Sequence, residues 1–356
     1  MTPSTLVQAV QLTRWQHPAE LRAVPHPEPG PGEVLLEVAG AGLCHSDLHL
    51  MHWPAGKLPY ELPFTLGHEV AGTVAGLGPG AEGIELGEHV LVYGPWGCGR
   101  CRRCSLGEEH LCESTGRLRG RGCGLGRDGG LAEYVVIPSP RLLVPIGDLD
   151  PVAAAPLADA ALTPYHAIRR ALPFLGPGSS AVVIGVGGLG HLAVQILRAL
   201  TPARIVAVDR REDALALALE AGAEIALGAA SLTAREARLA AGGRGADVVI
   251  DCVGAEPTLE LAAGVVRAGG HVALLGLAGA TFPMRFGAVP METSVIFSNW
   301  GTRAELAEVV ALAQRGLVHV EVERVPLSEA ISAYARLEAG EATGRCVAIP
   351  DAKVGV

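Results

Sequence analysis

The sequence predicts an α/β protein in which a Greek-key β-barrel domain precedes a doubly wound parallel sheet. Two observations support this prediction. Beyond Asp159, apolar runs of strand length alternate with helical patterns, which is typical of a parallel sheet with helices on both faces. Before Asp159, short Val-rich runs are separated by regularly spaced glycines, which favours a barrel that turns its corners at glycine. With 356 residues, the chain is long enough to form two such cores.

The composition excludes several classes of protein. Hydrophobic residues make up 49% of the chain, which is too many for a disordered protein. The net charge of −9 argues against a nucleic-acid-binding protein. The apolar stretch 181–200 is interrupted by glycines, His191 and Arg198, which argues against a membrane span. Residues 1–16 lack a basic stretch followed by an apolar core, so we expect no signal peptide and a cytoplasmic protein.

The elements of the first part are short and glycine-bounded. From Val7 to Val38 the composition predicts short strands broken by prolines. From Gly40 to His49, a turn that carries several reactive side chains leads into a short helix. Residues 51–63 combine proline, glycine and aromatic side chains, which is typical of a surface loop. The predicted strands are Val34–Val38, the glycine-rich run from Gly67 through Val74, Gly87–Val92 and Leu131–Ile137.

The elements of the second part alternate in type. A helical composition from Ala160 to Ala171 opens the alternation, and a helix from Thr302 through Gln314 follows it. A final strand, Arg345–Ile349, closes the chain. The predicted strands between these helices are residues 181–184, 204–208, 247–251, 271–276 and 295–300.

The most informative stretch runs from Ser179 to Asp209. An apolar, β-branched strand, Ala181–Ile184, leads directly into a glycine loop and an apolar-periodic helix. The next predicted strand ends on Asp209, 19 residues after the loop. Such glycines let backbone N–H groups approach a pyrophosphate at a helix N-terminus, and the acidic residue accepts hydrogen bonds from the ribose. The loop is Gly185, Val186, Gly187, Gly188, Leu189 and Gly190.

This stretch therefore predicts a dinucleotide-binding site. A carboxylate at Asp209 repels a ribose 2′-phosphate, so NAD is favoured over NADP. Arg210 and Arg211 follow directly and would weaken this preference. The alternative interpretation is that the glycines serve only strand–helix packing.

Four cysteines form a C-x2-C-x2-C-x7-C pattern: Cys98, Cys101, Cys104 and Cys112. Four thiolates at this spacing can surround one Zn²⁺ tetrahedrally and leave no open position, which is typical of a structural site. An iron–sulfur cluster is the alternative, because it also takes four thiolates. Disulfides are disfavoured, since adjacent C-x2-C pairs would be strained.

A second group of candidate ligands consists of Cys44, His68 and Asp159. They are far apart in sequence, and three protein ligands would leave the open position that a catalytic zinc needs. Each residue also has a structural interpretation. Cys44 could be a buried thiol, His68 a hydrogen-bonded strand histidine, and Asp159 the N-cap of the following helix.

The order of these motifs resembles the zinc-dependent medium-chain alcohol dehydrogenases over essentially the whole chain. The family's G-H-E-x-x-G-x5-G signature corresponds to Gly67–Gly72 followed by Gly78. Its four-cysteine lobe and its G-x-G-G-x-G loop match the two motifs described above. The resemblance implies a GroES-like catalytic domain of residues 1–158 with a C-terminal return of residues 301–356, and a Rossmann NAD-binding domain of residues 159–300.

The resemblance also implies roles for single residues. Cys44, His68 and Asp159 would ligate the catalytic zinc, with Glu69 beside it as a supporting or alternative ligand. Many relatives carry Cys where this chain has Asp159, and the Asp variant resembles a bacterial secondary-alcohol branch. Ser46 would hydrogen-bond the substrate oxygen and His49 would pass its proton to solvent. The implied cofactor contacts are His45 and Arg345 at the pyrophosphate, and Thr163, Val253 and Leu277 near the nicotinamide.

The resemblance implies reversible hydride transfer between NAD and an alcohol or ketone, with two zinc ions per chain. Tyr60, Leu125, Trp300 and Trp53 are candidate pocket walls, which favours medium-sized secondary or aromatic alcohols. Each could instead be an ordinary core or interface residue. The alternative functions are a polyol dehydrogenase, a metal-free quinone reductase and a non-catalytic zinc module that senses the dinucleotide. A homodimer or homotetramer is expected, since Val295–Phe297 forms an apolar outer strand.

Overall fold

The computed structural model describes residues 6–114, 122–281, 285–342 and 344–351. Contacts divide the chain into two compact units. Unit 1 comprises Met1–Asp159, Gly301–Gln314 and Val320–Val356, and unit 2 comprises Ala160–Trp300 and Arg315–His319. Asp159 is therefore the last residue of the first segment of unit 1, and the short segment 315–319 belongs to unit 2 rather than to the C-terminal return.

Unit 2 contains a six-stranded sheet in which all neighbouring strands are parallel. The strand order β13-β12-β11-β14-β15-β16 reads 3-2-1-4-5-6 in chain order, which is the Rossmann arrangement. The order reverses between β11 and β14, so ligands of such a sheet bind beyond the carboxyl ends of these two strands. The strands are β11 (Ser180–Ile184), β12 (Arg204–Asp209), β13 (Ile225–Gly228), β14 (Ala246–Asp251), β15 (Val266–Leu274) and β16 (Ser294–Phe297).

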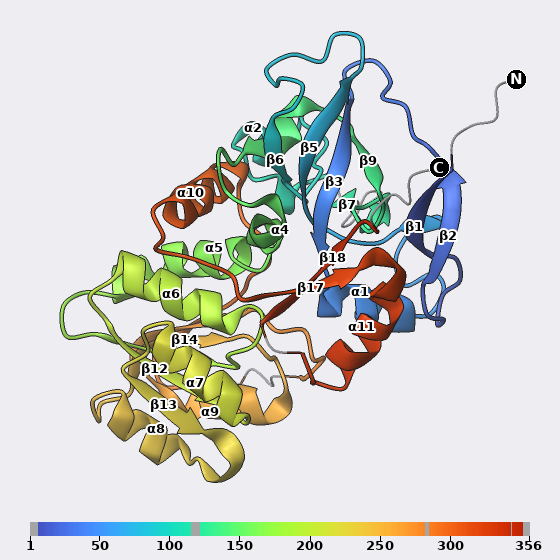
Figure 1. Cartoon of the computed structure of the whole chain (residues 1–356). Helices are drawn as coiled ribbons and strands as arrows, with labels where there is room; N and C mark the ends of the chain where they lie inside the picture. The colour runs from blue at the N-terminus through green and yellow to red at the C-terminus, as the bar shows by residue number, and fades with distance from the viewer. Residues whose placement is uncertain (1–5, 115–121, 282–284, 343, 352–356) are drawn as a thin grey trace, which may run out of the picture. The chain divides into compact units, whose positions relative to one another are not determined.

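The helices of unit 2 form two packed groups (Figure 1). In one group α5 contacts α6 and α6 contacts α7, and in the other α8 contacts α9. Because crossover connections between parallel strands are right-handed, reversal of the strand order places these groups on opposite faces of the sheet. The helices are α5 (Leu162–Ala171), α6 (Gly190–Leu200), α7 (Glu212–Glu220), α8 (Ala234–Ala240) and α9 (Glu256–Val265), with short 3-10 turns η4 (Leu172–Phe174) and η5 (Ala229–Ser231).

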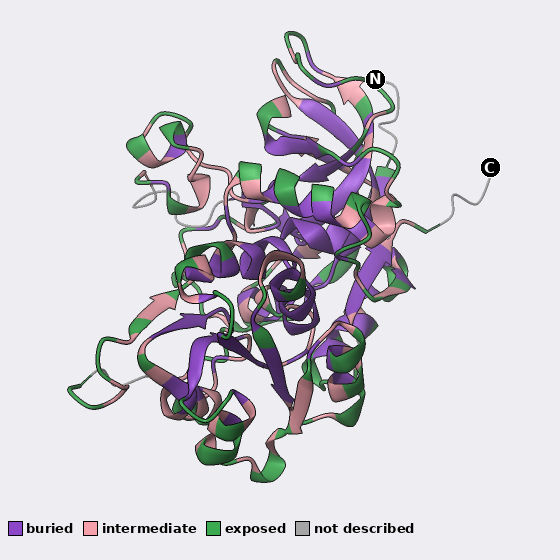
Figure 2. Ribbon diagram, turned by 90° about the vertical axis from the view of Figure 1, so that its left-hand side faces the viewer, coloured by how far each residue is buried: buried purple, intermediate pink, exposed green. Residues whose placement is uncertain are grey.

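The core of unit 2 consists of the β-branched strand residues predicted from the sequence. Val182, Val183, Val206 and Val249 are completely buried, because helices cover both faces of a doubly wound sheet. Figure 2 shows the buried residues concentrated along the strands, while exposed residues follow the outer sides of helices and the loops. The sheet therefore provides a rigid support for the loop that follows β11.

Unit 1 is built from mostly antiparallel sheets, in which only the pairs β17–β18 and β7–β8 are parallel among the described strands. Its largest sheet has the strand order β10-β6-β5-β3-β18-β17, with β9 paired to β3, and a smaller sheet has the order β2-β1-β4. A mixed β-rich unit of this kind agrees with the predicted barrel domain. Its strands are β1 (Leu6–Leu12), β2 (Glu20–Pro25), β3 (Val34–Gly42), β4 (Phe64–Thr65), β5 (Glu69–Leu77), β6 (His89–Val92), β7 (Gly122–Cys123), β8 (Gly126–Arg127), β9 (Tyr134–Ile137), β10 (Leu143–Pro145), β17 (Val322–Pro326) and β18 (Arg345–Ile349).

Glycine permits the close pairing of β3 with β5. A Cβ atom at Gly72 would lie 2.3 Å from the carbonyl oxygen of Glu37, and one at Gly78 would lie 1.8 Å from that of Gly30. Gly72 and Gly78 are therefore required by backbone contacts. The helices and turns of unit 1 are α1 (His45–His52), α2 (Arg102–Ser105), η1 (Glu109–Leu111), η2 (Pro140–Leu142), α4 (Pro151–Ala154), η3 (Ala155–Ala158), α10 (Arg303–Gln314), η6 (Leu327–Glu329) and α11 (Ala330–Glu338).

Several element boundaries differ from the predictions. The strand predicted from Leu131 begins only at Tyr134, and the strand predicted to reach Trp300 ends at Phe297. Asp159 caps the C-terminal end of η3 and is not the N-cap of α5, which is Ala161. Within the described residues, no helix is both long enough and apolar enough to cross a membrane.

Candidate zinc sites and dinucleotide-binding loop

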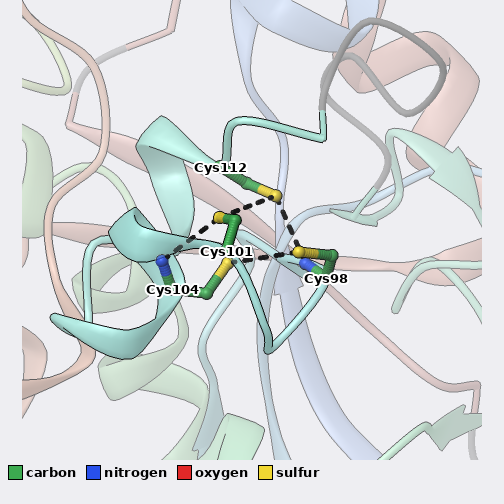
Figure 3. A group of neighbouring side chains, drawn as sticks. All are labelled: Cys98, Cys101, Cys104 and Cys112. Carbon is green, nitrogen blue, oxygen red and sulfur yellow. Dashed lines mark hydrogen bonds between the residues drawn. The ribbon is translucent and has the colours of Figure 1, made fainter.

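The four cysteines of the predicted structural site lie together in unit 1. Cys98 precedes α2, Cys101 is its N-cap, Cys104 lies within it, and Cys112 follows η1. The sulfur atoms of Cys98 and Cys104 are 4.0 Å apart, and those of Cys101 and Cys112 are 3.9 Å apart. Figure 3 shows the four side chains directed toward a common centre.

Hydrogen bonds favour thiolates at two of these cysteines. The hydroxyl of Ser114 donates to Sγ of Cys98 at 3.2 Å, and this bond is the main cause that lowers the pKa of Cys98 to about 6. The backbone N–H of Cys104 donates to Sγ of Cys101 at 3.5 Å and lowers the pKa of Cys101 below its ordinary value. Burial raises the pKa of Cys104 to about 12, and a bound cation would favour its ionisation.

This donor set fits zinc. Ligands about 2.3 Å from a Zn²⁺ ion in a tetrahedron are about 3.8 Å apart, which agrees with the observed sulfur separations. A disulfide is excluded, because its sulfurs would be about 2.05 Å apart, and all eight cysteines are free. With four ligands on short loops, the site would hold the lobe together and offer no position to a substrate.

The second predicted ligand set also converges, together with Glu69, the predicted supporting or alternative ligand. Cys44, His68, Glu69 and Asp159 are all buried, and their donor atoms lie within 4.8 Å of one another. Nε2 of His68 lies 3.6 Å from Oδ2 of Asp159. The structure therefore brings together the residues proposed for the catalytic zinc, with the Glu69 carboxylate among them.

The sheet of unit 1 explains this convergence. Gly42, at the end of β3, pairs with Glu69, at the start of β5, so Cys44 and His68 emerge at the same end of adjacent strands. The turn η3 packs against both strands, and Asp159 directly follows it. A Cβ at Gly42 would lie 2.0 Å from Oε2 of Glu69, so glycine is needed where the carboxylate sits.

A buried carboxylate holds His68 in place. Oδ1 of Asp47 lies 3.2 Å from Nδ1 of His68, and Oδ2 accepts a hydrogen bond of 3.1 Å from the backbone N–H of Cys44. Because the carboxylate only accepts, Nδ1 carries the proton and Nε2 is left as the metal-binding atom. Burial lowers the pKa of His68, but Asp47 and Asp159 outweigh it and raise this pKa well above its ordinary value.

Glu69 is paired with Arg345. Nη2 of Arg345 lies 2.5 Å from Oε1 of Glu69, and both side chains are almost fully buried. Burial raises the pKa of Glu69 to about 7, with the Arg345 charge opposing this effect. The pair places Arg345, which was predicted to contact the pyrophosphate, beside the ligand cluster of unit 1.

The donor chemistry of the second set also fits zinc. A thiolate, an imidazole nitrogen and a carboxylate oxygen are all ligands that zinc accepts, and two anionic ligands balance its charge. Asp47 and His68 form the carboxylate–histidine arrangement that orients a metal-bound imidazole. Such a set with three close ligands is typical of a catalytic zinc.

The predicted proton-transfer residues lie on α1, which begins directly after Cys44. Oγ of Ser46 is 3.7 Å from Sγ of Cys44. His49 stacks on Trp53, with ring centroids 6.1 Å apart, and burial lowers the pKa of His49 below its ordinary value. His45 is exposed at the first position of the helix.

The glycine loop of unit 2 has the geometry that a phosphate site needs. Gly185 has a φ angle of +85°, and a Cβ at Gly190 would lie 1.9 Å from the carbonyl oxygen of Gly185. In contrast, a Cβ at Gly187 would meet no atom within 4 Å. Two glycines are thus required by the turn, while Gly187 leaves open space near the N-terminus of α6, where an anion is stabilised.

Asp209 ends β12 and contacts this loop. Oδ2 accepts a 2.6 Å hydrogen bond from the N–H of Val186, and Oδ1 accepts one of 3.0 Å from the N–H of Arg211. Arg210 is exposed. The carboxylate is therefore fixed beside the loop, with lone pairs remaining for two ribose hydroxyls.

The other predicted cofactor contacts also lie in unit 2. Oγ1 of Thr163 accepts a 2.8 Å hydrogen bond from the N–H of Trp300. The N–H of Val253 donates to Asp251 at 2.8 Å, and Leu277 is exposed by 60%. Val253 also lies against the loop, since a Cβ at Gly185 would be 2.4 Å from its methyl group.

Three of the four predicted pocket residues share one apolar cluster of unit 1. Tyr60 belongs to its buried core and stands edge-on to Phe64, while Trp53 and Leu125 pack against it partly exposed. Trp300 lies in unit 2 and is partly exposed.

Two buried residues beside the zinc site, Asp47 and Tyr334, were not predicted from the sequence. The Tyr334 hydroxyl donates to Oδ2 of Asp47 at 2.7 Å, although 287 positions separate the two residues. An acidic residue in the first turn after Cys44 is a visible signal, whereas nothing in the sequence connects it to Tyr334.

Comparisons with known proteins cover the same regions. Residues 30–148 match the alcohol dehydrogenase GroES-like domain, and residues 188–315 match the zinc-binding dehydrogenase family. An NAD-dependent alcohol dehydrogenase of Sulfurisphaera tokodaii is 37% identical over 97% of this chain and 100% of its own length. A D-arabinose 1-dehydrogenase (NADP(+)) of Saccharolobus solfataricus is 34% identical over 96% of this chain and 97% of its own.

A solved structure supports the same assignment. Acetophenone reductase of Geotrichum candidum, in complex with NAD, superposes with a TM-score of 0.85 at 33% identity and covers 98% of both chains. Similarity at this level over the whole length shows that the chain belongs to the zinc-dependent medium-chain alcohol dehydrogenase family.

Proposed function

We propose that the protein is an NAD-dependent alcohol dehydrogenase that interconverts medium-sized secondary or aromatic alcohols and their ketones. The observation that carries this proposal is the convergence of Cys44, His68, Glu69 and Asp159 within 4.8 Å in a family of zinc-binding dehydrogenases. A non-catalytic zinc module would need the four-cysteine lobe but not this second set.

The residues of unit 1 would manage the proton. Cys44, His68 and Asp159 would hold the zinc ion, with Glu69 as supporting or alternative ligand. When bound, the zinc ion lowers the pKa of an alcohol hydroxyl and polarises a carbonyl. Ser46 would accept the hydroxyl proton, and His49 would pass it to water. The burial that lowers the pKa of His49 keeps this imidazole neutral and able to take up a proton.

The residues of unit 2 would hold the dinucleotide, which supplies the hydride acceptor at its nicotinamide. The glycine loop and the N-terminus of α6 would bind its pyrophosphate. Asp209 favours NAD, because a carboxylate accepts from a ribose hydroxyl and repels a 2′-phosphate. One of the relatives compared above is named for NADP(+), so similarity of the whole chain does not decide between NAD and NADP. The proposed preference for NAD therefore rests on Asp209. Thr163, Val253 and Leu277 would lie near the nicotinamide.

The substrate class rests on the apolar candidates for the pocket wall. Tyr60, Trp53 and Leu125 offer aromatic and aliphatic surface, which suits a phenyl or alkyl group better than a row of hydroxyls. A relative that reduces acetophenone supports an aromatic ketone. A relative named for D-arabinose makes a sugar or polyol the competing substrate class.

A substrate panel tests the proposal. Formation of NADH is followed by absorbance with 1-phenylethanol, 2-heptanol, ethanol, sorbitol and D-arabinose. We expect kcat/KM to be highest for the two secondary alcohols. A higher kcat/KM for D-arabinose or sorbitol would assign the competing class, and no turnover with any alcohol by zinc-loaded protein would contradict the proposed activity.

Two further features belong to the proposal. The protein would work in the cytoplasm, where reduced thiolates can bind zinc. It would also form a homodimer or homotetramer through β16. This strand lies at the end of the sheet order, and its Phe297 is exposed by 82%.

A further inference from the structure

We infer that Tyr334, on the C-terminal helix α11, is a positioning residue for the catalytic zinc and acts through Asp47. The inference rests on the proposed zinc-binding role of Cys44, His68 and Asp159. It concerns how this chain holds those ligands, which the proposed function leaves open.

Asp47 is the point at which three groups meet. Its Oδ1 contacts Nδ1 of His68, while its Oδ2 accepts from the N–H of Cys44 at 3.1 Å and from the Tyr334 hydroxyl at 2.7 Å. One carboxylate therefore connects two proposed zinc ligands to a side chain of α11. The helices α1 and α11, which carry Asp47 and Tyr334, pack against each other in unit 1 (Figure 1).

Burial makes each of these donors important. Asp47 is 0% exposed and Tyr334 is 3% exposed, so water does not replace a lost hydrogen bond. The Tyr334 bond is the shortest of the three, and hydroxyl donors to carboxylates form strong, well-directed bonds. Burial first, and the neighbouring Asp47 carboxylate second, raise the pKa of Tyr334 well above its ordinary value. The hydroxyl therefore keeps its proton and acts as a donor.

Loss of this donor would free Oδ2 of Asp47 on one side. The carboxylate could then turn toward its remaining donors, the N–H of Cys44 and Nδ1 of His68. The imidazole follows the carboxylate, because their hydrogen bond sets its orientation. Groups that orient a metal ligand in this way typically contribute about 10- to 100-fold to metal affinity.

The aromatic ring of Tyr334 has a separate, structural role. It belongs to the apolar core of unit 1 together with Leu327, Leu337 and Leu48. Tyr334→Phe keeps this packing and removes only the hydroxyl, so it separates positioning from core packing.

Tyr93 provides a matched control. It is also fully buried in unit 1, and its hydroxyl also donates one hydrogen bond of 2.7 Å, to the carbonyl oxygen of Gly301. Tyr93→Phe removes the same group from an equally buried position but does not involve Asp47. The two variants should lose similar amounts of thermal stability.

The experiment measures zinc release. Wild type and both variants are loaded with zinc, and transfer to a chromogenic chelator is followed by absorbance. Two release phases are expected, and the phase absent from Cys44→Ala identifies the site of His68. Tyr334→Phe should accelerate this phase roughly tenfold, while Tyr93→Phe should leave its rate unchanged.

A double-mutant cycle tests whether Asp47 transmits the effect. Asp47→Asn should accelerate the same phase, and adding Tyr334→Phe to it should cause no further acceleration. Equal rates in wild type and Tyr334→Phe, or fully independent effects in the cycle, would overturn the inference. Wild type lacking a phase that depends on Cys44 would instead contradict the proposed zinc site, so the two failures are distinguishable.

Discussion

The carboxylate of Asp209 accepts a 2.6 Å hydrogen bond from the backbone N–H of Val186, at the start of the glycine loop. The end of β12 is thereby joined to the loop that follows β11. This contact fixes the distance between the proposed pyrophosphate site and the proposed ribose site. That distance must match the separation of the two groups in a bound dinucleotide.

The first prediction concerns Asp209→Ser. Loss of a charged hydrogen bond to the ribose costs about 1.5–3 kcal/mol. The KM for NAD should therefore rise about 10- to 100-fold, at 1.4 kcal/mol per decade. Use of NADP should improve, because the repulsion of its 2′-phosphate disappears and Arg210 can pair with it. The kcat at saturating NAD should hardly change.

Asp209→Asn is the matched control, because its amide oxygen can still accept from the N–H of Val186. If support of the loop were the only role of Asp209, the Asn variant would keep the wild-type preference for NAD. An unchanged ratio of kcat/KM for NAD and NADP in both variants would show that Asp209 does not contact the ribose.

The second prediction concerns a buried ion pair of unit 2 and its pH dependence. Nε of Arg267 lies 2.7 Å from Oδ1 of Asp247, and the N–H of Ser180 donates to Oδ2 at 2.8 Å. Burial alone would raise the pKa of Asp247, but the hydrogen bonds from Arg267 and Ser180 and the charges of Arg267 and Arg244 outweigh it. The pKa of Asp247 therefore lies below its ordinary value.

A depressed folded-state pKa stabilises the protein above the unfolded-state pKa of about 3.9 and loses this effect as the pH falls through the folded-state value. Arg267→Leu should therefore lower the free energy of unfolding by about 2 kcal/mol at pH 7. The difference from wild type should shrink below about pH 4. Denaturant unfolding at several pH values measures this difference in the free energy of unfolding. A difference that stays constant down to pH 3 would contradict the lowered pKa of Asp247.

The third prediction concerns metal content. Elemental analysis should find about two zinc ions per chain, since two separate donor sets fit the ion. Cys44→Ala should lose one ion and all turnover while remaining folded. Cys104→Ala should lose the other ion and unfold at a lower temperature, by about 2–4 °C for each kcal/mol lost. Iron with a visible charge-transfer band in the wild type would assign the four-cysteine site to an iron–sulfur cluster.

These sites differ in how far the sequence could predict them. The four-cysteine site was predicted from spacing alone, because Cys98 and Cys112 belong to one short lobe. The glycine loop was predicted for the same reason, since strand, loop, helix and Asp209 follow one another along the chain. Local order of this kind is visible in a single sequence.

The second zinc site depends on long-range pairing. Its ligands meet because Gly42 pairs with Glu69 and because η3 packs on the same strands. Nothing in the spacing of Cys44 and Asp159 shows this, so residue type alone could only suggest the group, and the family resemblance implied its role as the catalytic zinc site. The contact between Asp47 and Tyr334 was not predicted at all, because it depends on how two helices pack.

The fourth prediction concerns assembly. Within the described residues β16 pairs only with β15, and Phe297 on this outer strand is exposed by 82%. An exposed apolar edge strand favours pairing with a second copy. Light scattering should show a dimer or tetramer, and Phe297→Asp should dissociate it. Leu239→Asp, on an exposed apolar residue of α8, should not, and a monomeric wild type at micromolar concentration would refute the prediction.

The fifth prediction concerns Gly187 and tests the phosphate site without changing a charge. A Cβ at this position would meet no atom within 4 Å, so Gly187→Ala should fold with nearly wild-type stability. The new methyl group would nevertheless occupy the space that a pyrophosphate needs near the N-terminus of α6. Calorimetry should show NAD affinity reduced at least about tenfold, which corresponds to about 1.4 kcal/mol.

Gly176→Ala is the matched control for this last experiment. Gly176 precedes β11 in the same unit, and a Cβ there would also meet no atom within 4 Å. Both substitutions reduce the conformational freedom of the unfolded chain to the same extent, so their effects on stability should be similar. A loss of NAD affinity confined to Gly187→Ala would then report contact with the ligand. Equal NAD affinity in the two variants would mean that the pyrophosphate does not approach the loop at Gly187.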